Sequence, residues 1–430
     1  MLGDRIEVEV TGVAHGGISV ARFEGRVVFV ADAIPGETVV VEVTENAKPS
    51  FWRAVTVEVL EPSPFRRDHV WAAASLDRAP ADRAGGAEFG HIDLGHQREL
   101  KRQVLVDALA RFGRTDAFSG VRVEALPSGG PASAAVADGV VPDADGTGWR
   151  TRVRLQVDAD GMPGPYAARS HRVISVDDIP LAVQEARAVL PLGERFRGAT
   201  HVDVVVPSFG DPFVVVEETR TTRHRARSDR RRIVERVGDR EFGLDARGFW
   251  QVHRHAAATL TRAVQDAVDP AAFDLHAANL DLYGGVGLLA AAVGDRFGDG
   301  MSITSVESDQ TATEHAAENL AEWVGAKTVA DRVDRFLRGI RMTAGPVERD
   351  RLSRATVVLD PPRSGAGREV VDQLAELAPT QIVYVACDPV ALARDVGMLA
   401  AHGYRLSGLR AFDLFPNTHH VEAVASFRRD

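Results

Sequence analysis

The only cysteine of the 430-residue chain, Cys387, lies in the sequence Val-Ala-Cys-Asp-Pro at residues 385–389, directly after an apolar run typical of a buried strand. Two further segments follow strand-like runs: Asp-Pro-Pro-Arg at residues 360–363 and the glycine-rich residues 281–287. The carboxyl ends of parallel strands are where α/β folds bind ligands, and a thiolate placed there can act as a nucleophile. Together the three segments predict covalent catalysis beside a nucleotide-type cofactor.

The glycine-rich turn at residues 281–287 connects a predicted strand to a predicted helix. Its glycines let the backbone approach a ligand closely at the N-terminus of the helix. Glu307 ends the next predicted strand, where its carboxylate can accept hydrogen bonds from both ribose hydroxyls. Because the turn lacks the third glycine of a dinucleotide fingerprint, a nucleoside cofactor is favoured, and a nicotinamide oxidoreductase is a distant alternative.

The Asp-Pro-Pro-Arg sequence at residues 360–363 also ends a predicted strand. Its two prolines restrict the backbone and keep Asp360 directed into the cleft. Alone, this sequence could simply terminate the strand. Combined with the glycine turn, it resembles the fourth motif of S-adenosylmethionine-dependent methyltransferases that act on bases.

The composition is that of an ordinary water-soluble globular protein with two or three domains. The chain has 45% hydrophobic and 26% charged residues and a net charge of −10. One cysteine excludes an internal disulfide framework and is typical of a reducing cytosol, and no apolar run is long enough to span a membrane. We therefore expect a cytoplasmic protein, acting as a monomer, without membrane association.

Three regions follow from the hydrophobic patterns. Residues 1–62 alternate apolar and charged positions over several short strands, which predicts a small closed β-barrel. Residues 63–248 predict a central strand-rich α+β domain of an RNA-binding type, in which a helix at residues 96–113 is expected to pack on the catalytic domain. Residues 249–430 alternate strands and helices, which predicts a Rossmann-like doubly wound sheet.

Within the last region the predicted elements are short and well separated by turns. The strands are expected at residues 279–283, 302–307, 356–359 and 381–385. The helices are expected at residues 255–268, 310–324, 368–377 and 390–402.

The chain as a whole resembles the RNA uracil-5 methyltransferase family, in the branch that carries an N-terminal TRAM barrel. The resemblance spans essentially the whole sequence. The segments that carry it are residues 249–252, 281–287, 306–307, 359–363, 385–389, 392–395 and 419–422.

This resemblance implies a class I methyltransferase fold and S-adenosylmethionine as the cofactor. It implies 5-methyluridine in RNA as the product. The cofactor-binding residues that it implies are Gln251, Asp281, Tyr283, Gly285, Gly287, Glu307, Asp331 and Asp360.

The resemblance also assigns the catalytic roles. Uracil C5 is a weak nucleophile, and addition of a thiolate at C6 makes C5 reactive toward a methyl group. Cys387 is the implied nucleophile, Glu422 the base that removes the C5 proton, and Asp360 the group that hydrogen-bonds the uracil edge. A uridine in structured RNA must be flipped out of its stack to reach such a site.

The sequence departs from the family pattern at several positions. Members with an iron–sulfur cluster need four cysteines, and the corresponding positions here are Arg78, Ala84, Ala87 and Ile179. We therefore expect no cluster and no other metal.

Three further exchanges surround the site. Gly284 replaces the usual cysteine of the cofactor turn, which is an exchange of one small residue for another. Ala386 and Asp388 replace the usual Ser and Asn beside the nucleophile, and Asp388 adds a negative charge near a thiol that must ionise.

RNA is the expected partner, and the barrel favours ribosomal RNA of the large subunit over transfer RNA. The basic run at residues 220–236 could bind phosphates or could be a solvated loop. The barrel itself offers no aromatic platform for bases beyond Phe51 and Trp52. A different alternative, supported by Asp388, is a non-catalytic RNA-binding protein that retains the fold.

Overall fold

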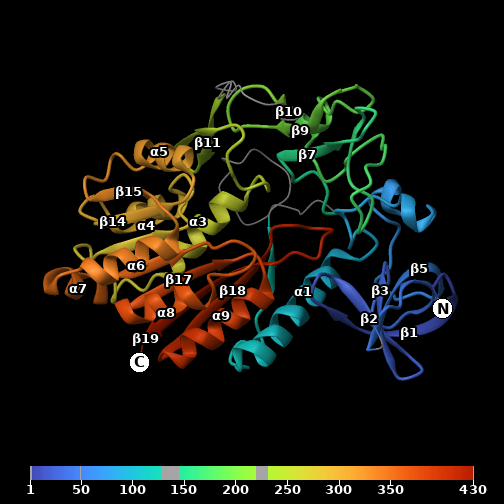
Figure 1. The fold of residues 1–430 in the computed structure, drawn as a ribbon, viewed down its shortest axis with the longest axis horizontal. Coiled ribbons are helices and arrows are strands. Elements are labelled where there is room, and N and C mark those ends of the chain that lie inside the picture. The colour runs from blue at the N-terminus through green and yellow to red at the C-terminus, as the bar shows by residue number, and fades with distance from the viewer. Residues whose placement is uncertain (1, 49, 127–144, 219–230, 430) are drawn as a thin grey trace.

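The structure is a computed structural model that describes residues 2–48, 50–126, 145–218 and 231–429 (Figure 1). The basic run at residues 220–236 lies largely outside the described residues. Within the described ranges, no helix combines the length and the apolar character needed to cross a membrane.

The N-terminal residues form a closed five-stranded barrel in the order β1-β2-β3-β5-β4, as predicted. Its interior is filled by alternate residues of the strands, mostly valines, together with Trp52, which is 2% exposed. Trp52 is therefore a core residue, and the expectation that it could stack on a base is wrong. The strands are β1 (Arg5–Ala14), β2 (Ile18–Phe23), β3 (Arg26–Ala31), β4 (Thr38–Glu45) and β5 (Phe51–Glu61).

The central region contains a four-stranded sheet in the order β10-β9-β7-β8 and a separate hairpin, β11-β12. Ala84, Ala87 and Ile179, three of the four positions expected to have lost cluster ligands, pack with Trp71 and Trp149 in one apolar core. Apolar side chains therefore surround these three positions. The elements are Ala72–Ala74 and Pro80–Asp82 (both 3-10 helices), β7 (Arg152–Val157), β8 (Pro163–Gly164), α2 (Gln184–Arg187), β9 (Ala199–Val205), β10 (Phe213–Glu218), β11 (Arg232–Val237) and β12 (Arg240–Asp245).

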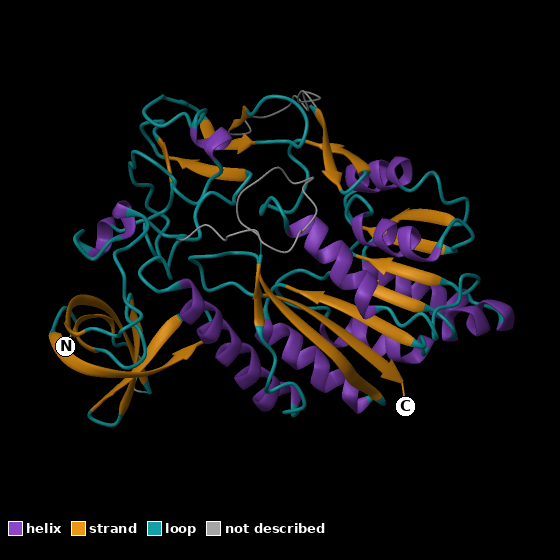
Figure 2. Cartoon of the chain, turned by 180° about the vertical axis from the view of Figure 1, so that it is seen from behind, coloured by secondary structure: helices purple, strands orange, loops and turns teal. Residues whose placement is uncertain are grey.

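Helix α1 (Leu94–Ala108), which continues as a π-helical turn over Leu109–Gly113, lies between the barrel and the C-terminal sheet (Figures 1 and 2). The helix begins at Asp93, whose side chain accepts hydrogen bonds from the amides of Gly95 and His96. Leu105 and Leu109 belong to the same apolar core as the sheet strands. Helix α1 thus packs on the catalytic domain, while the boundaries at residues 62 and 248 stay predictions.

The C-terminal region is built around an eight-stranded sheet in the order β15-β14-β13-β16-β17-β19-β18-β6. Its last strand, β6 (Val123–Ala125), belongs to the stretch of chain predicted to form the central domain, and it pairs in parallel with β18. Only β19 runs antiparallel to its neighbours. The other strands are β13 (Asn279–Leu282), β14 (Ile303–Glu307), β15 (Ala326–Ala330), β16 (Thr356–Leu359), β17 (Gln381–Ala386), β18 (Tyr404–Asp413) and β19 (Glu422–Arg429).

Helices cover both faces of this sheet, so its strands are apolar on both sides (Figures 1 and 2). In β17, Ile382 and Tyr384 belong to one core, with α1, α6, α8 and α9, whereas Val383 and Val385 belong to the other, with α3 and α4. The helices are α3 (Ala256–Ala267), α4 (Leu288–Phe297), α5 (Gln310–Asn319), α6 (Val333–Thr343), α7 (Pro346–Ser353), α8 (Gly367–Leu377) and α9 (Pro389–Ala401).

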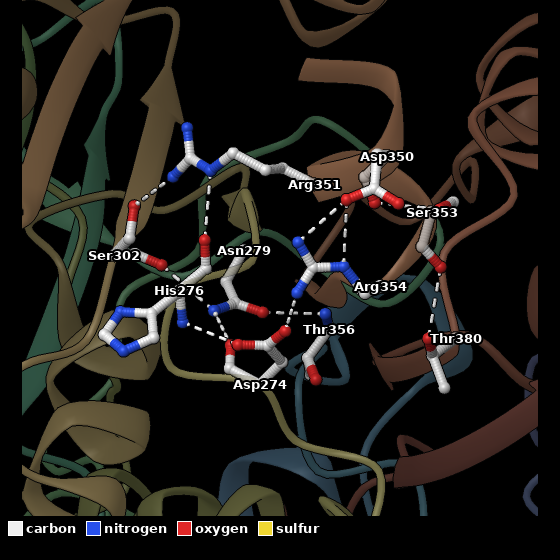
Figure 3. A network of polar contacts seen from close by, with 10 residues as sticks. All are labelled: Asp274, His276, Asn279, Ser302, Asp350, Arg351, Ser353, Arg354, Thr356 and Thr380. Carbon is white, nitrogen blue, oxygen red and sulfur yellow. Dashed lines mark hydrogen bonds and ion pairs between the residues drawn. The ribbon is translucent and has the colours of Figure 1, made fainter. Parts of the chain in front are cut away.

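A network of polar contacts holds the amino ends of the central strands together (Figure 3). Asn279 is buried, donates from Nδ2 to the carbonyl oxygens of Asp274 and Ser302, and accepts through Oδ1 from the amide of Thr356 at 2.8 Å. One amide side chain thereby ties the starts of β13 and β16 to the residue before β14. At the exposed margin of the same network, the Thr380 hydroxyl donates to the carbonyl of Ser353.

Replacing Asn279 by Ala should lower the free energy of unfolding by about 2–4 kcal/mol, because the buried Thr356 amide and the partly buried carbonyl groups of Asp274 and Ser302 each lose a hydrogen bond. Urea unfolding followed by circular dichroism measures the change. The matched control is Thr380→Val at the exposed margin of the network, where less than about 0.5 kcal/mol is expected. Equal losses in the two variants would contradict a central role for Asn279.

Candidate active site

The carboxyl ends of β13, β14, β16 and β17 open onto a cavity of about 1360 Å³. Among its lining residues are most of the positions expected from the sequence: Gln251, Tyr283, Gly285, Glu307, Asp360, Cys387 and Glu422. Asp281 lies behind the wall and is fully buried, and Gly287 forms the N-cap of α4. The structure therefore brings Cys387, the carboxylic acids Asp360 and Glu422, and the glycine turn to one cavity.

The glycine turn is shaped by left-handed backbone conformations. Gly285 has φ +54° and Gly287 has φ +90°. A Cβ on Gly285 would meet no atom within 4 Å, so this position leaves open space. A Cβ on Gly284 would lie 2.1 Å from Ser305 Oγ, which donates a 2.8 Å hydrogen bond to Asp281 Oδ2. Gly284 is therefore required by Ser305 and is more than an exchange of one small residue for another.

Glu307 is tied to the glycine turn across the sheet. Its Oε2 accepts a hydrogen bond from the Gly285 amide at 3.2 Å, and its Oε1 accepts from the Asp309 amide at 2.7 Å. The exposed Ser308 hydroxyl also donates to Oε1, at 3.0 Å. Because Oε2 keeps one lone pair and the Ser308 hydroxyl can rotate away from Oε1, the group can still accept from two hydroxyls. With the open space at Gly285, this geometry fits the nucleoside part of S-adenosylmethionine.

Two other implied cofactor residues differ in their placement. Gln251 lines the cavity, and the loop that carries it is anchored by the Thr151 amide, which donates to the carbonyl of Val252. Asp331 is not among the lining residues. Its carboxylate accepts from the Arg332 amide and pairs with Arg335 at 3.3 Å.

The register of two strands brings Cys387 and Glu422 together. Ala386 of β17 is paired with Ala423 of β19 in an antiparallel ladder. Cys387 follows Ala386 and Glu422 precedes Ala423, so the two residues are the next opposed positions. Asp360 follows Leu359, which is paired with Tyr384 on the adjacent strand.

Burial and mutual repulsion control the ionisation of this group. Loss of hydration, and then the charge of Asp281, raises the pKa of Asp360 to about 7. The pKa of Glu422 is raised well above its usual value by burial and then by Asp360, while Arg363 opposes the shift. Burial and the charges of Glu422 and Asp360 raise the pKa of Cys387 to about 12. Near neutral pH the Cys387 thiol therefore holds its proton, and burial favours the protonated form of Glu422.

Among the described residues, four arginines line the cavity, and Arg247 and Arg332 are paired with Glu217 and Asp334. Arg150 and Arg363 both line it, and neither forms an ion pair with a carboxylate in the described part of the chain. The pKa of Arg150 is lowered by burial and then by the charge of Arg363. Arg363 belongs to the recognised Asp-Pro-Pro-Arg sequence, but Arg150 stands in an arginine-rich stretch where nothing marks it out.

Asp388 is directed away from the thiol. Its Oδ1 accepts hydrogen bonds from the amides of Val390 and Ala391, and its Oδ2 lies 2.7 Å from Nε2 of His15. The carboxylates that raise the pKa of Cys387 are those of Glu422 and Asp360. The expectation that Asp388 opposes ionisation of the thiol therefore finds no support in this geometry.

Asp360→Asn should make the protein more stable than the wild type, and more so at pH 8 than at pH 5. Asp360 keeps its proton up to about pH 7 in the folded state, whereas the unfolded chain releases it near pH 4. Stability of the wild type therefore falls as the pH rises between these values, and the amide removes that loss. Urea unfolding should show a gain at pH 8 that exceeds the gain at pH 5 by about 2–3 kcal/mol, because one pKa unit corresponds to about 1.4 kcal/mol. A gain that does not change with pH would contradict the raised pKa.

Comparison with known proteins agrees with this geometry. Residues 246–429 match the family model of tRNA (Uracil-5-)-methyltransferase, and residues 1–57 match that of the TRAM domain. A protein of Streptomyces avermitilis described as an uncharacterized RNA methyltransferase is 38% identical over 453 residues, covering 99% of this chain and 98% of its own. A Bifidobacterium longum protein with the same description is 33% identical, covering 98% of this chain and 96% of its own.

The fold is also that of a solved structure, the tRNA (uracil-54, C5)-methyltransferase of Pyrococcus abyssi in complex with S-adenosyl-L-homocysteine. The two superpose with a TM-score of 0.67 over 98% of this chain and 99% of the other, at 23% identity. This likeness shows the architecture alone, whereas the family follows from the sequence matches. The chain therefore belongs to the TRAM-containing branch of the uracil-5 methyltransferase family, a family of S-adenosylmethionine-dependent RNA methyltransferases.

Proposed function

We propose that this protein methylates C5 of uridine in RNA, with large-subunit ribosomal RNA as the favoured substrate. The observation that supports the proposal best is the opposed placement of Cys387 and Glu422 at the ends of β17 and β19, with Asp360 beside them. A nucleophile and a proton acceptor on one wall are what substitution at a weakly reactive carbon requires.

The chain's own residues perform the covalent steps. The Cys387 thiol gives its proton to solvent, its sulfur bonds to uracil C6, and the electron pair of the C5–C6 double bond moves onto the O4 oxygen, which makes C5 nucleophilic. Bound S-adenosylmethionine supplies an electrophilic methyl group for C5. The Glu422 carboxylate then takes the proton from C5, the C5–C6 double bond re-forms, and the thiolate leaves.

The unusual ionisation of the cavity suits this sequence of events. Before the reaction the thiol is protonated, so it stays inert toward other electrophiles. A Glu422 carboxylate that holds protons strongly is a more effective base for a carbon acid than an ordinary glutamate. Asp360 can pair with the polar edge of the uracil and so orient C6 toward Cys387.

Cationic groups can hold the RNA backbone at the cavity. Arg150 and Arg363 repel one another until an anion lies between them, and a phosphodiester beside the flipped uridine is such an anion. Farther away, Phe29 and Phe51 contact each other edge to face on the barrel, and the Arg53 guanidinium lies near both rings. This cluster, rather than Trp52, is the base-stacking surface that we propose for the barrel.

Two alternatives remain as proposals. Transfer RNA as the substrate is favoured by the name of the matching family and of the Pyrococcus abyssi enzyme. A non-catalytic RNA-binding role rested on Asp388, whose carboxylate the structure directs away from the thiol. We further propose that the protein acts in the cytoplasm as a single chain, because every residue of the proposed site comes from one chain.

Cys387→Ala should abolish both methyl transfer and the covalent RNA adduct, because it removes the attacking sulfur. Glu422→Gln should still transfer the methyl group but accumulate the adduct, because the C5 proton is not removed. Denaturing gels of each variant mixed with labelled RNA and S-adenosylmethionine reveal the adduct as a shifted band. Wild-type turnover by Cys387→Ala would rule out the covalent scheme.

Phe51→Ala should weaken RNA binding about tenfold while leaving the rate of a saturated single turnover unchanged, because one stacked base is worth roughly 1–3 kcal/mol. Filter binding and rapid-quench methylation measure the two quantities. The control is Phe209→Ala, an exposed phenylalanine outside the barrel that should change neither. A loss in the turnover rate with unchanged affinity would contradict a binding role for the barrel surface.

A further inference from the structure

The barrel contacts the nucleophile segment directly. His15 lies in the turn between β1 and β2, and its Nε2 is 2.7 Å from Oδ2 of Asp388, the residue after Cys387. The His15 side chain is 51% exposed and that of Asp388 is 20% exposed, so the contact lies at the edge of the protein. The hydrogen bond that the Asp388 carboxylate accepts raises the pKa of His15. Against the effect of burial, the same contact lowers the pKa of Asp388, so the charged pair is favoured.

Asp388 also determines where α9 begins. Its Oδ1 accepts hydrogen bonds from the amides of Val390 at 3.0 Å and Ala391 at 2.8 Å, which makes it the N-cap of this helix. The backbone that joins Cys387 to α9 is therefore fixed through one carboxylate. The other oxygen of that carboxylate is the one that faces His15.

The same barrel turn also contacts the segment that leads to the proposed base. A Cβ on Gly17 would lie 2.3 Å from His419 Cβ, so this close approach depends on glycine. His419 precedes Glu422 by three positions in the chain. Residues 15–17 of the barrel, Cys387 and His419 line one small cavity of about 120 Å³. The turn thus touches both chain segments that carry the proposed chemistry.

We propose that His15 is a positioning residue for Cys387: it holds Asp388 in its capping geometry and balances its charge, so that the barrel completes the surroundings of the nucleophile. The proposal rests on the proposed function for its catalytic consequence. The proposal also explains the aspartate at position 388, because His15 on the barrel balances the negative charge that this residue adds near the thiol.

The charges around His15 are consistent with this role. Asp388 is the carboxylate that it contacts, and Arg394 on α9 opposes its protonation. The other charged or titratable side chains that line the small cavity are Lys101, Arg363, His419 and His420. Lys101 is already paired with Asp413, at 2.5 Å. Removal of His15 therefore leaves Asp388 without its nearest cation.

The first test uses the thiol itself and requires neither RNA nor methyl transfer. Cys387 is the only cysteine, so iodoacetamide reports on this site alone. At a fixed pH of 7.0, His15→Ala should be alkylated about threefold more slowly than the wild type, because an Asp388 carboxylate without its histidine partner disfavours the thiolate. In an Asp388→Asn background, where asparagine still caps the helix, the same substitution should have no effect.

The matched control is another histidine–aspartate pair, at the opposite end of α9. His402 at the end of α9 lies 2.8 Å from Asp372, and His402→Ala should leave the alkylation rate unchanged. His15→Gln, which keeps a hydrogen-bond donor but no charge, should give an intermediate rate. The proposal would be overturned if His15→Ala were alkylated at the wild-type rate. It would also be overturned if this substitution slowed alkylation equally with aspartate and with asparagine at position 388.

The second test measures catalysis by single turnover with saturating RNA and S-adenosylmethionine. His15→Ala should lower the methylation rate about tenfold, with RNA and cofactor affinities unchanged, and Asp388→Asn should restore most of the loss. A lower RNA affinity with an unchanged rate would instead make His15 an RNA contact and overturn the proposal. If the wild type does not methylate, the proposed function fails, while the alkylation rates still decide the role of His15.

Discussion

The antiparallel pairing of β17 with β19 is the constraint on which the proposed chemistry depends. All strands of the sheet other than β19 run in the same direction, and in a parallel sheet the residues after each strand gather at one edge. Because β19 runs the opposite way, it begins at the edge where β17 ends. Glu422, the first residue of β19, therefore lies opposite Cys387, the residue that follows β17. A strand inserted in the parallel direction would place the glutamate at the far edge of the sheet.

The loop before β19 is held in place by residues from the N-terminal half of the chain. Asn417, at φ +65°, accepts hydrogen bonds through Oδ1 from Arg67 and Gln97 and donates from Nδ2 to the carbonyls of Asp145 and Gly146. Lys101 of α1 forms a buried pair with Asp413, just before the loop. Removing one partner of such a pair is costly because the other is left as an uncompensated buried charge. The barrel, α1 and the central region thus help to shape the catalytic cavity.

The sequence predicted most of the site because Glu307, Asp360 and Cys387 each end or follow a short apolar strand, and parallel strands bring their carboxyl ends together. Glu422 was reached only through the family resemblance, since no local pattern marks the first residue of an antiparallel strand. Arg150 and His15 were missed because their roles arise from contacts between distant segments. No helix or strand was predicted for residues 326–353, and within them β15 is a half-exposed edge strand without an apolar run. The three-residue strand β6 is too short to show a period.

Release of tritium from uridine labelled at C5 tests most directly whether a methyl group replaces the C5 proton. Ribosomal and transfer RNA from cells that lack this protein would be incubated with it, with and without S-adenosylmethionine. We expect cofactor-dependent release, greater from ribosomal RNA, because the C5 proton must leave after the methyl group arrives. Transfer of a methyl group to either RNA without loss of tritium from C5 would contradict the proposed chemistry, because the methyl group would then have gone to another atom.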